Sequence, residues 1–351
     1  GTALPMTLNT INEFSEAILE VEEVIALQTY AGTASPFNFN GLVRHYYLRM
    51  QPWEGDIQVQ LLDKTERDRS SHEIAADVRA RLLEIIKDRD DVRIQVVEMP
   101  PGPPVLQSVV AEVYGPDAEI RRQVARDLEK MFDASANITD VDTLMAEPYQ
   151  VWRFEVDTEK AVRRGISVDT INRTLKMSLG EFMLGDVKDG HKLEPTYIVL
   201  QVPLEVRAEL GRLKEMPVSS QFGGTVPLGE LGDFYQIDQE PVIYHKDLRP
   251  VEYVTGETQG RLGAPIYGMF DVLDALENYT APDGVELEGT WTAPPETDAV
   301  SSFEWAGEWT VTYETFRDMG MAFGAAIILI YMLVVMEFGN FSLPAVIMAP
   351  I

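Results

Sequence analysis

Four stretches of the chain carry apolar residues at helical spacing. They cover residues 11–21, 74–85, 120–132 and 265–276, and within each the apolar positions are three or four residues apart. This spacing places the apolar side chains on one face of a helix. Each stretch therefore predicts an amphipathic helix that packs against a core.

A segment rich in β-forming residues follows each of these helices. These following strands are predicted at 24–30, 92–97, 138–143 and 285–291, and preceding strands at 43–62, 105–114 and 251–255. A strand, a helix and a returning strand make a βαβ unit, and two such units make a ferredoxin-like split-βαβ sheet. The predicted fold class is therefore α+β, with two ferredoxin-like split-βαβ subdomains.

A proline-rich segment, residues 99–104, separates these two subdomains, because proline disfavours both helices and central strands. The first subdomain is expected to cover residues 1–99, and the second 105–150 together with 248–292. Residues 151–247 are expected to form an inserted domain within the second subdomain. An insertion of this kind is tolerated where its two ends lie close together.

Short polar side chains mark the beginnings of three predicted helices. Ser70 and Glu73 have the spacing of a capping box, in which each side chain binds the backbone of the other residue. Asp117 is a candidate N-cap, since its oxygens can accept from N–H groups of the first turn, and a further helix is expected to begin after Ser167. The helix after Ser167 lies between two predicted strands, so the inserted domain is expected to be α+β as well.

The longest apolar run of the chain is residues 319–336 (MGMAFGAAIILIYMLVVM), with 18 residues and no charge. About 20 helical residues cross a hydrocarbon core. A buried core helix is the alternative. The run is apolar on all faces, however, and Gly320 and Gly324 have the spacing that lets membrane helices approach closely. Both features favour a transmembrane helix at 319–337.

The flanks of this run indicate how it is connected. Residues 293–318 are expected to be a linker to the membrane, and residues 341–351 the start of the next transmembrane helix. Only a tight turn separates the two apolar runs. A receptor with a single membrane anchor would not need a second apolar run, so this arrangement favours two consecutive membrane helices.

Composition excludes several classes of function. The formal net charge is −28, which argues against a nucleic-acid partner because such binding needs a cationic face. The chain has no cysteine, and its four histidines are isolated from other metal ligands, so no metal site is predicted. Phosphate loops and nucleophile elbows are absent from the sequence. The chain is therefore not expected to be an enzyme or to hold a cofactor.

Aromatic residues gather in one loop and the segment after it, residues 29–53. The candidate substrate-binding residues there are Tyr30, Phe37, Phe39, Tyr46 and Tyr47, and the candidate hinges are Gly32 and Gly41. Aromatic rings on a flexible loop can bind many apolar or cationic ligands without strict geometry. The two adjacent tyrosines are expected on a strand, facing opposite ways, with one of them in the core.

The order of these pieces resembles the resistance–nodulation–division (RND) efflux transporters, in the C-terminal of their two large periplasmic loops. The resemblance is carried by residues 1–4 (GTAL), 153–175 (RFEVDTEKAVRRGISVDTINRTL), 185–190 (GDVKDG), 197–207 (YIVLQVPLEVR), 216–231 (MPVSSQFGGTVPLGEL) and 337–350 (EFGNFSLPAVIMAP). Residues 35–40 (SPFNFN) differ from the glycine-rich family version, so the shape of the family's pocket does not carry over.

The resemblance implies a proton-driven antiporter that exports hydrophobic or amphiphilic small molecules as a homotrimer. The two split-βαβ subdomains would be porter subdomains, the insertion a docking domain, and the aromatic loop the switch loop of the drug pocket. It also implies a periplasmic adaptor (a membrane fusion protein), an outer-membrane channel and a bacterial inner-membrane location in the lipid bilayer, with residues 1–318 in the periplasm. The family's proton relay lies outside this chain.

Three other readings stay open from the sequence. A copper or silver exporter of the same family would use methionines, of which Met50 and Met99 lie near the expected strands. A membrane-anchored extracytoplasmic binding or sensor domain is a second alternative. A protein-translocation or lipid-exporting relative with the same architecture is a third.

Overall fold

The chain forms two compact units. The computed structural model describes residues 2–89, 92–98, 105–145, 149–180, 182–188, 190, 195–240, 242–259 and 263–349. The larger unit contains Gly1–Ala146 and Val242–Ile351, and the smaller contains Glu147–Pro241. The predicted linker at 99–104 lies outside the described residues.

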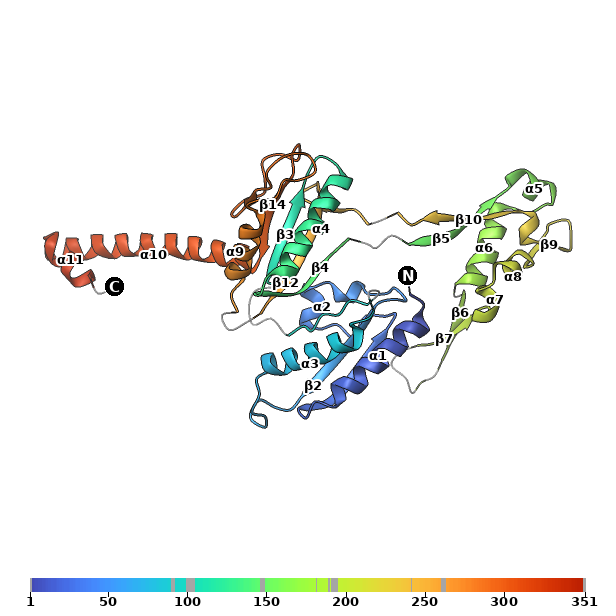
Figure 1. Ribbon diagram of the computed structural model, residues 1–351, viewed down its shortest axis with the longest axis horizontal. Helices are drawn as coiled ribbons and strands as arrows, with labels where there is room; N and C mark the ends of the chain where they lie inside the picture. Colours follow the sequence, from blue (N-terminus) through green and yellow to red (C-terminus); the bar gives the residue numbers. More distant parts are fainter. Residues whose placement is uncertain are drawn as a thin grey trace. The chain divides into compact units, whose positions relative to one another are not determined.

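The first part of the larger unit is a two-stranded antiparallel ribbon that packs on two helices. Strands β1 (Val24–Ala31) and β2 (Gly55–Leu61) pair, and helices α1 (Leu4–Leu19) and α3 (Ser71–Ile86) lie along them (Figure 1). Their shared core contains Phe14, Ile18, Val21, Ile74, Val78 and Leu82. The helical spacing of these residues in the sequence therefore corresponds to their burial on one face of each helix.

The strand predicted at 43–62 is shorter than expected. It begins only at Gly55, and helix α2 (Phe39–Val43) and the 3-10 turn η1 (Tyr46–Leu48) precede it. His45, between them, has a φ of 59°, in the left-handed region. An extended strand cannot pass through that conformation, so the aromatic segment folds back on itself before β2 begins.

The strand predicted at 92–97 is wrong for the residues that the structure describes. The side chains of Val92, Ile94 and Val96 pack against the core, but the segment joins no sheet. Its backbone is bound by side chains instead. The N–H of Val96 donates to Asp140 Oδ2 at 3.2 Å, and its carbonyl accepts from Arg79 Nη2 at 2.9 Å.

A six-stranded sheet forms the second part of the larger unit (Figure 1). Its strand order is β11 (Tyr244–Lys246), β12 (Arg249–Thr258), β3 (Val109–Tyr114), β14 (Ser302–Gly307) and β13 (Gly289–Thr290), and β4 (Ile138–Thr143) also pairs with β12. All pairs are antiparallel except β13 with β14. Helices α4 (Ala118–Ala134) and α9 (Pro265–Leu276) contribute to a core that includes Leu128, Phe132, Met269, Phe303 and Trp305.

The linker expected at 293–318 is wrong in its central part. Residues 302–307 form β14, which lies directly beside β3 in the sheet. Phe303 and Trp305 are two residues apart, as side chains on one face of a strand are, and both are fully buried in the core. The strand predicted at 285–291 is correspondingly short and contains only Gly289–Thr290.

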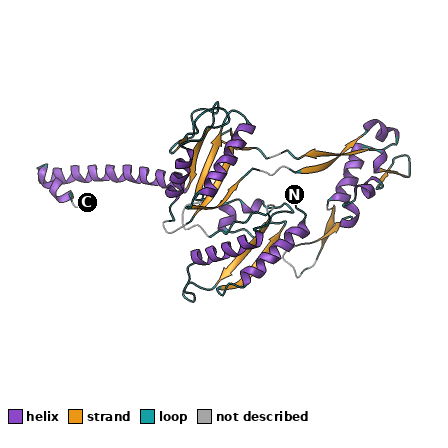
Figure 2. Ribbon diagram, in the orientation of Figure 1, coloured by secondary structure: helices purple, strands orange, loops and turns teal. Residues whose placement is uncertain are grey.

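A helix of 31 residues, α10 (Glu308–Phe338), follows β14 without a loop. It contains the apolar run predicted at 319–337 and begins well before it. Figure 2 shows it as one uninterrupted helix, and it is long and apolar enough to cross a membrane, with a mean hydropathy of 2.4 in its apolar window. Helix α11 (Ser342–Met348) lies in the second apolar run, after Gly339 ends α10 in a left-handed conformation.

The smaller unit is also α+β. It contains β5 (Gln150–Val156), α5 (Thr158–Arg163), α6 (Val168–Leu179), β6 (Phe182–Val187), β7 (Thr196–Leu200), α7 (Leu204–Arg207), α8 (Leu210–Lys214), β8 (Pro217–Ser219), β9 (Thr225–Pro227), η2 (Leu228–Glu230) and β10 (Gly232–Asp238). Strands β5 and β10 pair along their whole length. The two ends of the insertion therefore lie side by side, as an inserted domain requires.

The three helix starts predicted at these residues are confirmed, and Ser167 proves to be an N-cap as well. Ser70 and Glu73 make both hydrogen bonds of a capping box at the start of α3. Asp117 accepts from the N–H of Ile120 at 2.9 Å, and Ser167 from that of Thr170 at 3.1 Å. Each bond satisfies an N–H group that the helix itself leaves without a partner.

Candidate functional site

The aromatic loop, residues 32–54, is closed at its base by one backbone hydrogen bond. The N–H of Gly32 donates to the carbonyl of Glu54 at 2.8 Å, and Gly32 has a φ of 65°. A glycine suits this turn, because a Cβ there would also lie 2.8 Å from Leu4. Gly41, expected as a second hinge, instead lies within α2, where Asn38 Oδ1 accepts its N–H at 2.7 Å.

Three of the predicted aromatic residues are exposed on this loop. Phe37 is 69% exposed, Phe39 44% and Tyr47 40%. The rings of Phe37 and Tyr47 are in contact, tilted by 48° with centroids 5.8 Å apart. Other exposed apolar side chains of the same segment are Leu42, Leu48, Met50 and Trp53. An exposed apolar surface of this kind is typical of a binding site.

Tyr46 and Tyr47 lie in a 3-10 turn rather than on a strand, so the predicted alternation of their side chains is wrong. Neither of them is among the buried core residues, since Tyr46 is half-buried and Tyr47 exposed, so the expectation that one of them supplies core is not met. The guanidinium carbon of Arg49 lies 3.8 Å from the centre of the Tyr46 ring. Burial raises the pKa of Tyr46, although the charges of Arg44 and Arg49 act in the opposite direction.

Tyr30 lies on β1, and its hydroxyl donates to Gln28 Oε1 at 3.0 Å. Gln28 and Tyr30 are two residues apart on a strand, so their side chains lie on the same face of the ribbon, where this bond joins them. The ring pair that the structure brings together is that of Phe37 and Tyr47. Tyr30 therefore stays a predicted substrate-binding residue.

Two arginines of this segment were missed from the sequence. Arg49 forms an ion pair with Asp56 on β2 and lies over Tyr46. Arg44, at the end of α2, is buried against residues far away in the chain. In the sequence, both are simply arginines among aromatic residues. Such neighbours are also common on ordinary protein surfaces, so nothing marked either arginine as functional.

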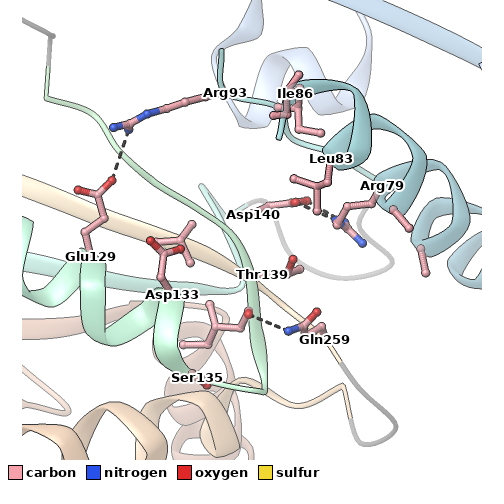
Figure 3. A pocket seen from close by; sticks show the side chains of 15 residues that line it. Arg79, Leu83, Ile86, Arg93, Glu129, Asp133, Ser135, Thr139, Asp140 and Gln259 are labelled. Carbon is pink, nitrogen blue, oxygen red and sulfur yellow. Dashed lines mark hydrogen bonds and ion pairs between the residues drawn. The ribbon is translucent and has the colours of Figure 1, made fainter. Parts of the chain in front are cut away.

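A groove of about 650 Å³ lies between α3 and the α4–β4 region (Figure 3). Helix α3 lines it with Arg79 and with apolar side chains such as Leu83 and Ile86, and α4 lines it with Glu129 and Asp133. Two ion pairs link the sides, Arg79 with Asp140 and Arg93 with Glu129 (Figure 3). The sequence analysis did not predict this groove, because its walls come from segments far apart in the chain.

Metal ligands do not gather in the described residues, where no three His, Asp or Glu side chains form a group that could hold an ion. Met50 is 73% exposed, and Met99 lies outside the described residues. Gly320 and Gly324 have open space beside them on α10. Their role in helix packing therefore stays a prediction.

A family model described as the AcrB/AcrD/AcrF family matches residues 1–351. The chain belongs to this family of RND efflux permeases. The resemblance found in the sequence is therefore confirmed.

Two curated relatives are similar to parts of this chain. The swarming motility protein SwrC of Bacillus subtilis (strain 168) is 22% identical over 234 residues, which are 66% of this chain and 20% of SwrC. SilA of Salmonella typhimurium, whose name places it in a cation efflux system, is 22% identical over 179 residues, 50% of this chain and 16% of SilA. The matched segments thus span a fifth or less of these relatives.

Solved structures show the same fold. Two crystal forms of a heavy metal efflux pump superpose with TM-scores of 0.71 and 0.69, over 99% and 98% of this chain and 33% of the pump, at 16% identity. The predicted α+β fold class, with the RND porter fold and an apolar C-terminal helix, is therefore confirmed.

Proposed function

We propose that this chain is the periplasmic porter and docking region, with the following membrane helix, of a proton-driven RND pump that exports hydrophobic or amphiphilic compounds. The exposed rings of Phe37, Phe39 and Tyr47 are the observation that carries the substrate class. Rings that stay exposed cost hydration free energy, which a bound apolar or cationic ligand recovers. The chain would lie in a bacterial inner membrane, with residues 1–318 in the periplasm.

The substrate class is tested by removing two rings. A Phe37→Ala/Phe39→Ala variant of the full-length transporter is expected to raise the half-saturating concentration of hydrophobic dyes roughly 10- to 30-fold, at about 1 kcal/mol per ring. Dye efflux is measured in a bacterial host that lacks its own pumps. Phe222→Ala, which removes an exposed ring from the smaller unit, is the matched control and should leave efflux unchanged.

Unchanged efflux of every dye in the double variant would contradict the assignment of the loop. A copper or silver exporter is the second candidate, favoured by the names of SilA and of the heavy metal pump and by the exposed thioether of Met50. Silver and copper tolerance is therefore measured in the same strains. Tolerance that rises with the wild-type protein and falls with Met50→Ala would favour metal over dyes.

The smaller unit would be the docking domain of a homotrimer that also binds an adaptor and an outer-membrane channel. Its β6–β7 hairpin exposes apolar side chains on both faces: Met183, Leu184, Val187, Tyr197, Ile198, Val199 and Leu200. A two-stranded ribbon is marginally stable alone, and an exposed apolar patch of this kind is typical of a protein interface.

A photo-crosslinking residue at position 198 is expected to join the hairpin to a second copy of the chain. The product should migrate as a crosslinked dimer or trimer on a denaturing gel. The same group at position 162, which is exposed on α5, is the control and should give little product. Crosslinks that map only within one chain would sink the docking assignment.

A further inference from the structure

Arg44 connects the aromatic loop to the six-stranded sheet. It lies between Phe39 and Tyr47 in the sequence, but its side chain is only 6% exposed. Its Nη1 lies 2.5 Å from Glu257 Oε1 on β12 and donates to Gln107 Oε1 at 2.5 Å. The exposed rings of the loop are thus carried on a segment that a buried guanidinium fastens to another part of the fold.

The glutamate that Arg44 binds belongs to a polar cluster at the base of α10. Ser108 Oγ donates to Glu257 Oε2 at 2.6 Å and lies 3.2 Å from Glu308 Oε1. Glu308 is the first residue of α10, and its N–H donates to the carbonyl of Ser108 at 3.1 Å. A continuous set of contacts therefore runs from Arg44 through Glu257 and Ser108 to the first turn of α10.

The backbone of residues 107–108 packs tightly against Gly307, the residue directly before α10. Gly307, directly before α10, has a φ of 81° and a ψ of −140°. A Cβ there would lie 2.6 Å from the carbonyl oxygen of Gln107 and 2.8 Å from that of Ser108. Because the two backbones are in direct contact, a displacement of residues 107–108 must displace the start of α10.

We propose that Arg44 is a positioning residue for export. Through Glu257 and Ser108 it holds the aromatic loop in a fixed position relative to the first turn of α10, so that movement of either is passed to the other. The role in export rests on the proposed function. The physical basis is that a largely buried carboxylate such as Glu257, whose side chain is 16% exposed, needs a nearby cation, and that coupling passes through packed and hydrogen-bonded groups.

The test uses the full-length transporter and the rate of dye export at increasing dye concentration. Arg44→Met, which removes the charge, is expected to lower the maximal rate at least about tenfold while the half-saturating concentration changes less than about threefold. Arg44→Lys should restore part of the rate. Ser108→Ala removes the hydroxyl contacts to Glu257 and Glu308 but leaves the ion pair of Arg44 with Glu257 intact, and it should lower the maximal rate in the same way.

The matched control is Arg122→Met. Arg122 lies 3.4 Å from Glu252, a buried glutamate on the same strand β12, and it contacts neither the loop nor Gln107 or Ser108 among the bonds of the described residues. Its loss also leaves a buried carboxylate without its arginine. Export per folded molecule should stay at the wild-type rate in this variant, so an equal loss in both variants would overturn the proposal.

A distance measurement separates this proposal from the proposed function. Spin labels at the exposed positions 48 and 316 report on the loop and on α10, and the chain itself has no cysteine. The wild-type protein and Arg122→Met should give a narrow distance distribution, and Arg44→Met a broad one. An unchanged distribution in Arg44→Met would overturn the proposal, even if export is lost. If the wild-type protein exports nothing, the proposed function fails, and the distribution still decides the role of Arg44.

Discussion

Replacing Trp305 with alanine is expected to lower the free energy of unfolding of the larger unit by about 3–5 kcal/mol. The side chain is fully buried. Its ring stacks on Phe132 at 6.0 Å and meets Phe303 edge-on at 4.9 Å. Removal would leave a cavity among rings that cannot collapse into it. The full-length protein in detergent should lose roughly 10 °C of thermal stability, read as the folded fraction after heating.

Two further variants make this prediction specific. Trp305→Phe keeps most of the ring and removes an indole N–H that has no hydrogen-bond partner in the described part of the chain, so a smaller loss is expected. Trp152→Ala, at a half-exposed tryptophan of the smaller unit, should cost less than about 1 kcal/mol. Equal losses for Trp305→Ala and Trp152→Ala would contradict the role of Trp305 in the core.

Replacing Arg79 with methionine is expected to cost about 3–5 kcal/mol, because a buried carboxylate would lose its cation. Arg79 binds Asp140 with two hydrogen bonds, Nε to Oδ1 at 2.8 Å and Nη2 to Oδ2 at 2.7 Å. The Asp140 side chain is only 4% exposed, and it also accepts the N–H of Val96. Thermal stability of the full-length protein is again the measurement.

Two further variants distinguish the loss of the Arg79–Asp140 ion pair from the mere removal of one positive charge. An Arg79→Met/Asp140→Asn double variant should be more stable than the sum of the single losses indicates, since neither charge is then left alone. Arg163→Met breaks a fully exposed pair with Glu159 on α5 and should cost less than about 0.5 kcal/mol. If Arg79→Met costs no more than Arg163→Met, the burial of Asp140 has no energetic consequence.

Local hydrogen bonds explain what could be predicted of the fold from the sequence. The starts of α3, α4 and α6 follow from single side chains, Ser70, Asp117 and Ser167, that bind N–H groups three residues away. Such signals depend on nothing outside the helix. The amphipathic helices follow in the same way from apolar spacing.

The missed elements depend on partners far along the chain. Residues 92–97 have β-forming composition, but Asp140 and Arg79 bind the backbone of Val96 in place of a strand. Strand β14 was taken for part of a linker because its partner, β3, lies almost two hundred residues earlier. The residues next to Val96 and next to β14 in the sequence contain no sign of these distant partners.

In the candidate site, too, the features that follow from residue type could be predicted, and those that depend on distant contacts could not. Phe37, Phe39 and Tyr47 could be proposed from residue type and loop composition, and all three are exposed. The turn of Tyr46 and Tyr47 depends on the left-handed backbone of His45, which the sequence does not reveal. The burial of Arg44 depends on Gln107, which lies just before β3, and on Glu257 of β12, both far from Arg44 in the chain.

The uninterrupted course of α10 has a mechanical consequence. A helix of 31 residues is about 46 Å long at a rise of 1.5 Å per residue. It contains no proline, so no residue in it forces a kink. A tilt of about 5° at Gly307 would swing its far end by roughly 4 Å, by the length of the helix alone. The helix would thus act as a rigid arm that begins at the end of β14, so that any small tilt at its first turn becomes a much larger displacement at Phe338.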